Sequence, residues 1–332
     1  MQMVLVATQS LAYATVPGDD PSGSDAPLRE VEITSSVDGT TQVVMVWVPD
    51  TDKPTPLLVA LHTWSGDFRQ ANPRDQFWGE AKARGWAFIH PDFRGPSNTP
   101  HGCASELAIV DVLDAVTYAK QHANIDDTRI YLVGSSGGGH MALQMVGAAP
   151  EVWAGVSAWV PITDLAAWHA FHTRDGTSGK YARHIEAACG GPPGASAAVD
   201  AQYRDRSPIH HLSNAAGLPV DINAGIYDGH RGSVPIDHSL RAFNVLAEAN
   251  GHPEMRLSAE EMAHLVEHAT IPPGWAETLP DDAAQPRRYA VLLRRTAGPA
   301  RLTLFDGGHT QDPAPAVAWL AAQRRVDPSE EE

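Results

Sequence analysis

The strongest constraint on the fold of this chain is an alternation of short apolar runs with helical patterns. Residues 57–62 (LLVALH) form a continuous apolar run, as expected for a strand that is covered on both faces. Residues 105–122 place apolar side chains at spacings of three and four, which predicts an amphipathic helix. The alternation continues to a last strand at 300–305. It predicts an α/β fold with a mostly parallel sheet and helices on both faces.

An antiparallel pair is expected before this alternation begins. Residues 29–49 alternate apolar and polar side chains on both sides of Asp38-Gly39, which predicts a hairpin with a tight turn. With the two hairpin strands, we expect an eight-stranded sheet. The six other strands are predicted at LLVALH (57–62), WAFIHP (86–91), RIYLVG (129–134), WAGVSAWVP (153–161), LPVDINAG (218–225) and ARLTLF (300–305).

Two stretches, 161–215 and 255–298, do not fit the alternation. Long insertions in a compact domain are usually functional lids or peripheral decoration. We therefore expect the first to be a cap. The predicted organisation is a flexible N-terminal segment (1–27), a single domain (28–325) that carries both insertions, and an acidic tail (326–332).

The charge balance limits the partners. The chain has 24 basic and 40 acidic residues and a net charge of −16. Without a basic stripe, a nucleic acid or an anionic membrane is not an expected partner, and neutral or cationic substrates are favoured. No run of eighteen apolar residues predicts a membrane span. If the apolar start with Ala12-Tyr13-Ala14 is a trimmed signal peptide, the protein is secreted or periplasmic, and otherwise it is cytoplasmic. The oligomeric state is not predicted.

No metal or other cofactor is expected. Cys103 and Cys189 lie in no CxxC or zinc spacing, and they are either one disulfide or two buried thiols. In the first insertion, His169 and His172 have the spacing of one helix face, but no carboxylate accompanies them. A folded loop with surface histidines is therefore favoured over a metal site.

The motif that points to chemistry lies between a predicted strand and a predicted helix. The sequence GSSGG places G-x-S-x-G on Gly134, Ser136 and Gly138. A sharp corner here would expose the serine oxygen at the edge of the sheet and aim the Gly137 N–H at a developing oxyanion. The alternative is a glycine-rich turn with serines that cap the helix. A P-loop is excluded because no Lys-Ser or Lys-Thr follows. We predict that Ser136 is a nucleophile.

A serine nucleophile needs a base and an orienting acid. Asp228 follows the predicted strand 218–225, and His309 follows the last strand, so both would lie at the carboxyl edge of the sheet. His309 would take the serine proton, and Asp228 would fix its tautomer. Asp306 and Asp237 are the alternatives for the acid.

The loop after the strand 57–62 is the expected source of a second oxyanion donor. The Trp64 backbone N–H is the candidate and Thr63 is its rival. The indole of Trp64 is also a candidate for contact with substrate, and the alternative is that it packs the loop. Either the first insertion is a cap whose aromatic faces stack on a sugar or aryl ring, or it is a folded loop with surface histidines and no role in binding substrate. The predicted substrate-binding residues are Trp64, His62, Trp168 and His230.

Several runs together resemble a known family. They are PDFRG (91–95), GSSGGGH (134–140), RSPIHHL (206–212), the segment 223–244 and LFDGGH (304–309). They are similar to the catalytic domain of the prolyl oligopeptidase group of α/β-hydrolases, which also contains acetyl xylan esterase-like and feruloyl esterase-like enzymes. The resemblance spans about residues 30–315. It implies the α/β-hydrolase fold and the triad roles given above.

One departure from the family pattern concerns the acid. In such chains the acid usually stands about three residues before Val-Pro, whereas Asp228 precedes Val234-Pro235 by six. A second difference concerns substrate. The peptidases of the group carry a β-propeller before the hydrolase domain, and fewer than sixty residues precede the third strand here.

The resemblance therefore implies an esterase. We expect a serine carboxylic-ester hydrolase that removes short acyl groups, such as acetyl, from a carbohydrate or a similar small-molecule or polysaccharide ester through an acyl-enzyme. The alternatives are a prolyl oligopeptidase-type serine peptidase without its propeller and a non-catalytic binding protein with the hydrolase fold.

Overall fold

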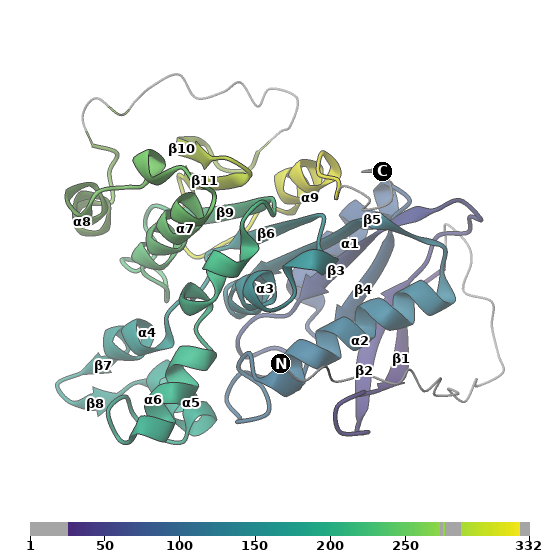
Figure 1. Ribbon diagram of the computed structural model, residues 1–332, viewed down its shortest axis with the longest axis horizontal. Helices are drawn as coiled ribbons and strands as arrows, with labels where there is room; N and C mark the ends of the chain where they lie inside the picture. Colours follow the sequence, from purple (N-terminus) through teal and green to yellow (C-terminus); the bar gives the residue numbers. More distant parts are fainter. Residues whose placement is uncertain (1–25, 273–274, 276–286, 326–332) are drawn as a thin grey trace, which may run out of the picture.

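The computed structural model describes residues 26–272, 275 and 287–325. The predicted N-terminal segment 1–27, including the signal-peptide candidate, lies almost entirely outside the described residues, and the acidic tail 326–332 lies entirely outside them, as does most of the Pro-rich part of the second insertion. Figure 1 shows a central sheet with helices around it and a group of small elements beyond one end.

The sheet is mixed and mainly parallel, which confirms the predicted fold class. Its five inner pairs, from β4-β3 to β9-β11, are parallel, and the pairs β1-β2, β2-β4 and β11-β10 are antiparallel. The strands in spatial order are β1 (Arg29–Thr34), β2 (Thr41–Trp47), β4 (Ala87–Pro91), β3 (Thr55–Leu61), β5 (Ile125–Ser135), β6 (Gly155–Trp159), β9 (Val220–Gly225), β11 (Ala300–Phe305) and β10 (Val291–Ala297).

The sheet has nine strands rather than the eight predicted. The additional strand is β10, which lies inside the second predicted insertion and pairs with β11 across the short turn at Gly298-Pro299. An edge strand has one neighbour and buries few side chains, and only Leu293 and Ala297 of β10 are buried. Its sequence, with two adjacent arginines, therefore lacks the alternation that identified the other strands.

The predicted hairpin is present, but its turn is longer than expected. The paired residues nearest the turn are Thr34 and Thr41, so six residues rather than two connect β1 to β2. Asp38 does not close a two-residue turn because its carboxylate accepts hydrogen bonds from the backbone N–H and the hydroxyl of Thr40, at 3.1 and 2.7 Å. The turn therefore presents the other carboxylate oxygen to a neighbouring segment.

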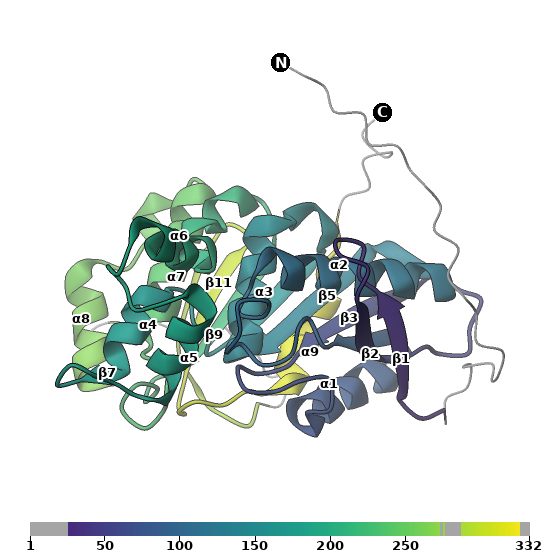
Figure 2. The same ribbon diagram turned by 90° about the horizontal axis from the view of Figure 1, so that it is seen from below.

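Helices cover both faces of the sheet (Figure 2). On one face α1 and α9 pack with Leu58, Phe88 and Val133, and on the other α2, α3 and α7 pack with Leu57 and Val59. This two-sided burial explains the continuous apolar runs of the inner strands. The helices are α1 (Ala71–Ala83), α2 (Glu106–His122), α3 (Gly137–Ala148), α7 (Asp237–Ala249), α8 (Ala259–His268) and α9 (Pro313–Ala321), with short 3-10 turns at Pro150–Val152, Pro208–His210, Leu212–Ala215 and Pro253–Met255. None in the described part of the chain is long and apolar enough to cross a bilayer.

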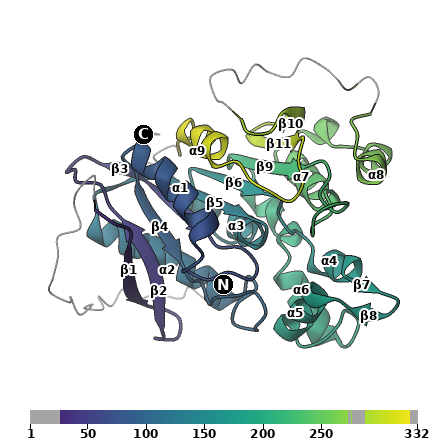
Figure 3. The same ribbon diagram turned by 180° about the vertical axis from the view of Figure 1, so that it is seen from behind.

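The first insertion, 161–215, folds into a group of small elements beyond the end of the sheet, which we call the cap (Figure 3). Its apolar cluster includes Trp64 and Cys103 from the main body, so the cap is packed onto the loops at that end. Cys103 and Cys189 are both buried there as free thiols. The cap contains α4 (Leu165–Phe171), β7 (Thr173–Arg174), β8 (Thr177–Ser178), α5 (Lys180–Cys189) and α6 (Ala197–Asp205).

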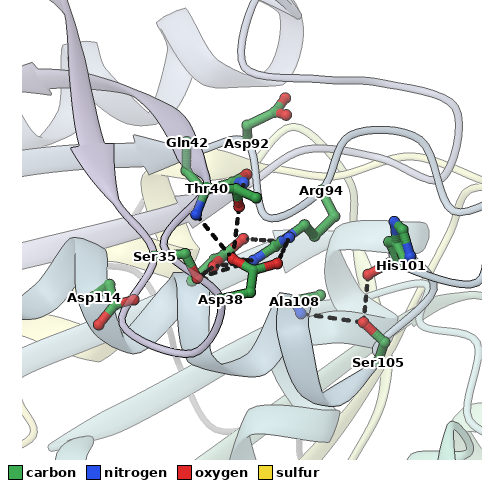
Figure 4. Close-up of polar contacts among 12 residues, drawn as sticks. Ser35, Asp38, Thr40, Gln42, Asp92, Arg94, His101, Ser105, Ala108 and Asp114 are labelled. Atoms are coloured by element: carbon green, nitrogen blue, oxygen red, sulfur yellow. Dashed lines mark hydrogen bonds and ion pairs between the residues drawn. The ribbon is translucent and has the colours of Figure 1, made fainter.

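A buried arginine ties the hairpin to the segment after β4 (Figure 4). The Arg94 guanidinium donates to Asp38 Oδ2 at 2.7 Å, to Asp111 Oδ1 on α2 at 3.0 Å and to the Ser35 hydroxyl at 2.9 Å. Burial raises the pKa of Asp111, although the hydrogen bonds from Arg94 and Ser35 oppose that rise. The Asp111 carboxylate therefore depends on Arg94 as its counter-charge.

Three buried histidines link elements of the core through Nδ1. His90 Nδ1 lies 2.7 Å from the Ala60 carbonyl oxygen, and His140 Nδ1 lies 3.0 Å from that of Ile162. His238 Nδ1 instead accepts a hydrogen bond from the Thr163 backbone N–H at 3.1 Å. Burial lowers the pKa of His140 to about 4 and the pKa values of His90 and His238 to about 3. All three rings are therefore neutral at pH 7.

Replacement of Arg94 by alanine should lower the free energy of unfolding by about 3 kcal/mol, because it leaves the buried Asp111 carboxylate unpaired. Arg69→Ala is the control: among the described residues, the exposed Arg69 forms an ion pair with Asp67 and lies over the Phe68 ring, so this change should cost less than about 1 kcal/mol. Urea unfolding measures both. Equal losses in the two variants would contradict the role given to Arg94.

The buried histidines predict a loss of stability in acid. Between the unfolded pKa of about 6.5 and the folded values, the unfolded chain binds protons that the folded chain does not. The free energy of unfolding should therefore fall from pH 6.5 toward pH 4, by about 1.4 kcal/mol per pH unit for each histidine. His90→Gln should reduce this slope by about one histidine's share, whereas the exposed His101→Gln should not. An unchanged slope in His90→Gln would refute the assignment.

Candidate active site

The site begins at a strained corner between β5 and α3. Ser136 occupies it with φ 59° and ψ −117°, a conformation that a residue with a side chain rarely adopts. Its N–H donates to the Trp159 carbonyl at 2.9 Å, and its carbonyl accepts the first bond of α3, from His140 N–H at 2.8 Å. Both backbone groups are thereby fixed, and the hydroxyl is left at the end of the strand.

Glycines around this corner permit a very close backbone approach. A Cβ atom on Gly137 would lie 2.2 Å from the Trp64 nitrogen, and one on Gly134 would lie 2.2 Å from the Gly138 carbonyl oxygen. Neither contact is possible for a residue with a side chain. The start of α3 therefore touches the loop after β3 directly, residues 62–70, which we call the β3 loop.

The structure brings together the three side chains that the sequence predicted to act together. His309 follows β11, and its Nε2 lies 2.8 Å from Ser136 Oγ. Its Nδ1 lies 2.6 Å from Oδ2 of Asp228, which follows β9. A carboxylate only accepts, so Nδ1 carries the proton and Nε2 is the atom that can accept one from the serine. This arrangement can deprotonate Ser136 during an attack on an electrophile.

The Asp228 carboxylate is held by the segment before Val234-Pro235, whose length departs from the family pattern. The backbone N–H groups of Gly229 and Val234 donate to Asp228 Oδ1 at 3.0 and 3.2 Å. Gly232 lies against the same carboxylate. A Cβ atom at this position would be 2.0 Å from Asp228 Oδ1 and 2.8 Å from His309 Cβ, so the position requires glycine. The longer spacing before Val234-Pro235 thus forms a loop around the Asp228 carboxylate.

Neither alternative acid contacts His309. The Asp306 side chain is exposed. Asp237 begins α7 and pairs with Arg241 at 3.2 Å. Asp228 is thus the acid that the geometry selects.

Hydrogen bonds within the β3 loop distinguish Trp64 from Thr63 as the second oxyanion donor. The Thr63 N–H already donates to Gln70 Oε1 at 2.9 Å, while Gln70 Nε2 donates to the Thr63 hydroxyl at 2.8 Å. The Trp64 N–H makes no hydrogen bond to another described residue. Gly137 is the first residue of α3, where a backbone N–H has no partner within the helix. The adjacent N–H groups of Trp64 and Gly137 are therefore available to one oxyanion.

His62, a predicted substrate-binding residue, is buried, and its ring connects this loop to the segment after β4. Its Nδ1 lies 2.9 Å from the Thr63 carbonyl oxygen and its Nε2 lies 2.7 Å from that of Asp92. The ring stacks on Phe93 with centroids 3.8 Å apart. Burial lowers the pKa of His62, and its contacts with the two carbonyl groups oppose that decrease. The Asp92 carboxylate also accepts the Phe68 N–H at 3.0 Å.

The other three predicted substrate-binding side chains also lie outside the triad cavity. Trp64 and Trp168 are 2% and 1% exposed, and their indoles pack edge to face. Trp168 Nε1 donates to the Ser233 carbonyl at 2.7 Å. His230 is exposed, with Nε2 2.8 Å from the Val266 carbonyl oxygen. It lines a separate cavity of about 390 Å³ that includes Asp228 but neither of the other two triad residues.

A cavity of about 350 Å³ opens beside Ser136 and His309. Sequence reasoning missed most of its other walls. Three of these residues could have been predicted from their positions: Thr310 and Gln311 follow His309, and Tyr181 lies in the cap. No sequence pattern marks the other lining residues. The missed residues are Asn72, Pro73, Gln76, Tyr181, Ser233, Arg288, Thr310 and Gln311.

The two cap histidines that share a predicted helix face, His169 and His172, have partners within the protein. His169 Nε2 lies 2.8 Å from Glu186 Oε1, and His172 Nε2 donates to the Ser233 carbonyl at 2.8 Å. Within residues 26–272, 275 and 287–325, no group of three or more His, Cys, Asp or Glu side chains could hold a metal ion.

Comparisons with known proteins agree with this geometry. Residues 82–272, more than half of the chain, match the model of the prolyl oligopeptidase family. Feruloyl esterase B of Thermothelomyces thermophilus is 29% identical over 133 residues, which cover 37% of this chain and 45% of that protein. The chain thus spans less than half of the length of this relative.

Solved structures show the same fold at low identity. Oligopeptidase B from Leishmania major aligns with a TM-score of 0.55 and 12% identity over 89% of this chain and 35% of its own. Acylaminoacyl peptidase from Pyrococcus horikoshii aligns with a TM-score of 0.52 and 16% identity over 67% of this chain and 35% of its own. The family match establishes that the chain belongs to the prolyl oligopeptidase family, within the α/β-hydrolases, and the solved structures share its fold.

Proposed function

We propose that the protein is a serine carboxylic-ester hydrolase with Ser136 as nucleophile, His309 as general base and Asp228 as orienting acid. The observation that carries the proposal is the continuous relay from Ser136 Oγ through His309 to Asp228, at 2.8 and 2.6 Å, beside a cavity. Oxygen and nitrogen are already within the range needed for proton transfer.

The proposed reaction has two stages. Ser136 Oγ attacks the acyl carbonyl while His309 Nε2 takes its proton, and Asp228 stabilises the imidazolium that forms. The N–H groups of Gly137 and Trp64 hold the oxyanion, an interaction typically worth about 10²–10³ in rate per donor. His309 then protonates the leaving alcohol, and the acyl group remains on Ser136. A water molecule, deprotonated by His309, then attacks the acyl carbonyl; the bond to Ser136 Oγ breaks, His309 returns the proton to Ser136 and the acid is released.

The proposed substrates carry short acyl groups, such as acetyl, on a carbohydrate or a similar alcohol. The amides of Asn72, Gln76 and Gln311 in the cavity wall suit hydroxyl groups of a sugar, and about 350 Å³ leaves little room for a long acyl chain. Trp168 of the cap is buried, so its ring does not present a face on which a large aromatic acyl group could stack. The similarity to feruloyl esterase B supports ester chemistry.

The alternative is a serine peptidase of the prolyl oligopeptidase type. The same triad cleaves amides and esters, and the solved structures that share the fold include acylaminoacyl peptidase and oligopeptidase B. Catalytic geometry alone does not separate the two reactions, so the distinction rests on substrate.

A substrate series tests the proposal. We expect 4-nitrophenyl acetate and butyrate to be hydrolysed faster than the decanoate, and alanyl-prolyl and glycyl-prolyl 4-nitroanilides not to be cleaved. Ser136→Ala should lower ester turnover by at least about 10⁴-fold, because no other oxygen at this corner contacts His309 Nε2. Initial rates at 405 nm measure both.

Labelling provides the control for this series. A fluorophosphonate probe should modify the wild-type protein at Ser136 and leave Ser136→Ala unlabelled. Rapid anilide cleavage would replace the esterase with the peptidase. Absence of both labelling and turnover would reject a catalytic role for the chain.

The assignment of the acid is tested by a matched pair of variants. Asp228→Asn should lower kcat by about 10³–10⁴-fold, because an amide at this position no longer holds the His309 proton on Nδ1. Asp306→Asn, which changes an exposed carboxylate three residues before His309, should keep kcat within about two-fold. A large loss in Asp306→Asn with activity retained in Asp228→Asn would reverse the assignment.

A further inference from the structure

The charge of the cavity beside Ser136 is opposite in sign to that of the chain. Among the described residues, no carboxylate lines this cavity, and Arg288 is its only arginine or lysine. The chain as a whole has 40 acidic and 24 basic residues. A cationic wall is therefore a local feature that the overall composition does not predict.

Arg288 is held at the cavity by its backbone and its neighbour. Its N–H donates to Oδ2 of the buried Asp312 at 2.7 Å. The next residue, Tyr289, packs on Phe305 with ring centroids 5.4 Å apart, and its hydroxyl lies 3.3 Å from that of Thr310. These contacts fix the segment against the loop that carries His309.

The guanidinium of Arg288 has no acidic partner in the described structure. The arginines of the core differ in this respect: Arg94 pairs with Asp111, and Arg301 pairs with Asp221 at 2.8 Å. Arg288 itself is exposed, and the carboxylate nearest its backbone, that of Asp312, forms no ion pair with its side chain. A free guanidinium beside a nucleophile can donate two parallel hydrogen bonds to a carboxylate.

We propose that Arg288 binds a carboxylate of the substrate, so that the preferred esters are those with an acidic group near the scissile bond. The inference rests on the proposed function and narrows its substrate class to carboxylate-bearing esters. The acid belongs either to the acyl group or to the alcohol, as in an acidic sugar. In both cases the guanidinium acts on binding, and the triad performs the same reaction.

The net charge of −16 is compatible with this selectivity. Salt at about 0.1 M screens exposed charges beyond about 10 Å, so the acidic surface lowers the encounter rate of an anion but has little influence inside the cavity. A direct contact with Arg288 is far shorter than this screening length. The expectation of neutral or cationic substrates, drawn from the whole chain, is thus replaced at the site by a preference for anions.

Paired substrates test the proposal on each side of the ester. Mono-4-nitrophenyl adipate against 4-nitrophenyl hexanoate places a carboxylate on the acyl side, and 3-acetoxybenzoate against 3-acetoxybenzamide places it on the alcohol side. We expect Arg288→Gln to raise KM for the anionic member of at least one pair by about three- to ten-fold, with kcat and the neutral member changed less than two-fold. Arg288→Lys should retain part of the preference.

Arg174→Gln is the matched control, because it removes the same charge from an exposed arginine of the cap that does not line the cavity. It should leave both KM values unchanged. The proposal is wrong if Arg288→Gln and Arg174→Gln change the KM values alike. It is also wrong if Arg288→Gln changes KM equally for the anionic and the neutral member of each pair. Neither result would contradict ester hydrolysis itself.

A binding measurement separates this failure from failure of the proposed function. Equilibrium dialysis of mono-4-nitrophenyl adipate and of 3-acetoxybenzoate with Ser136→Ala, and with the same variant carrying Arg288→Gln, needs no turnover. Weaker binding of either anion in the double variant, with the neutral partner unaffected, supports the inference even if no ester is hydrolysed. Equal binding of both anions in the two variants overturns it.

Discussion

The chemistry of this protein depends on how closely the start of α3 approaches the end of β3. A Cβ atom on Gly137 would lie 2.2 Å from the Trp64 nitrogen, and one on Gly138 would lie 2.5 Å from the Leu61 carbonyl oxygen. Only glycine permits this contact, and the contact brings two free N–H groups together beside Ser136. The positive φ of Ser136 costs about 1–3 kcal/mol, which the buried helix α3 offsets through its packing.

That contact is useful only if the β3 loop keeps its shape, and the support comes from distant parts of the sequence. His62 and the Asp92 side chain bind the loop to the segment after β4, and the Ser97 N–H donates to the Trp64 carbonyl at 2.8 Å. Arg94 then fixes this segment to α2 and to the hairpin turn. The antiparallel edge of the sheet therefore stabilises the loop that carries the proposed oxyanion donor, the Trp64 N–H.

Sequence patterns predicted the parts of the molecule whose position follows from a strand. The inner strands were recognisable because both faces are buried, and the three triad residues were recognisable because each follows a strand end. Most of the other residues that line the cavity were not recognisable from the sequence. An aromatic residue in an insertion can face substrate or core, and Trp168 faces the core because Ser233 provides a buried acceptor for its indole N–H. Arg288 adjoins an edge strand that has almost no pattern of its own.

The cap is nevertheless coupled to the triad, and one of the links is the Ser233 carbonyl group. Ser233 accepts hydrogen bonds from Trp168 and His172 of the cap, and the next residue, Val234, donates its N–H to the Asp228 carboxylate. A displacement of the cap would also move the loop that holds the acid. Changes in the cap that alter substrate choice must therefore preserve these two donors, because losing them would also disturb the group that orients His309.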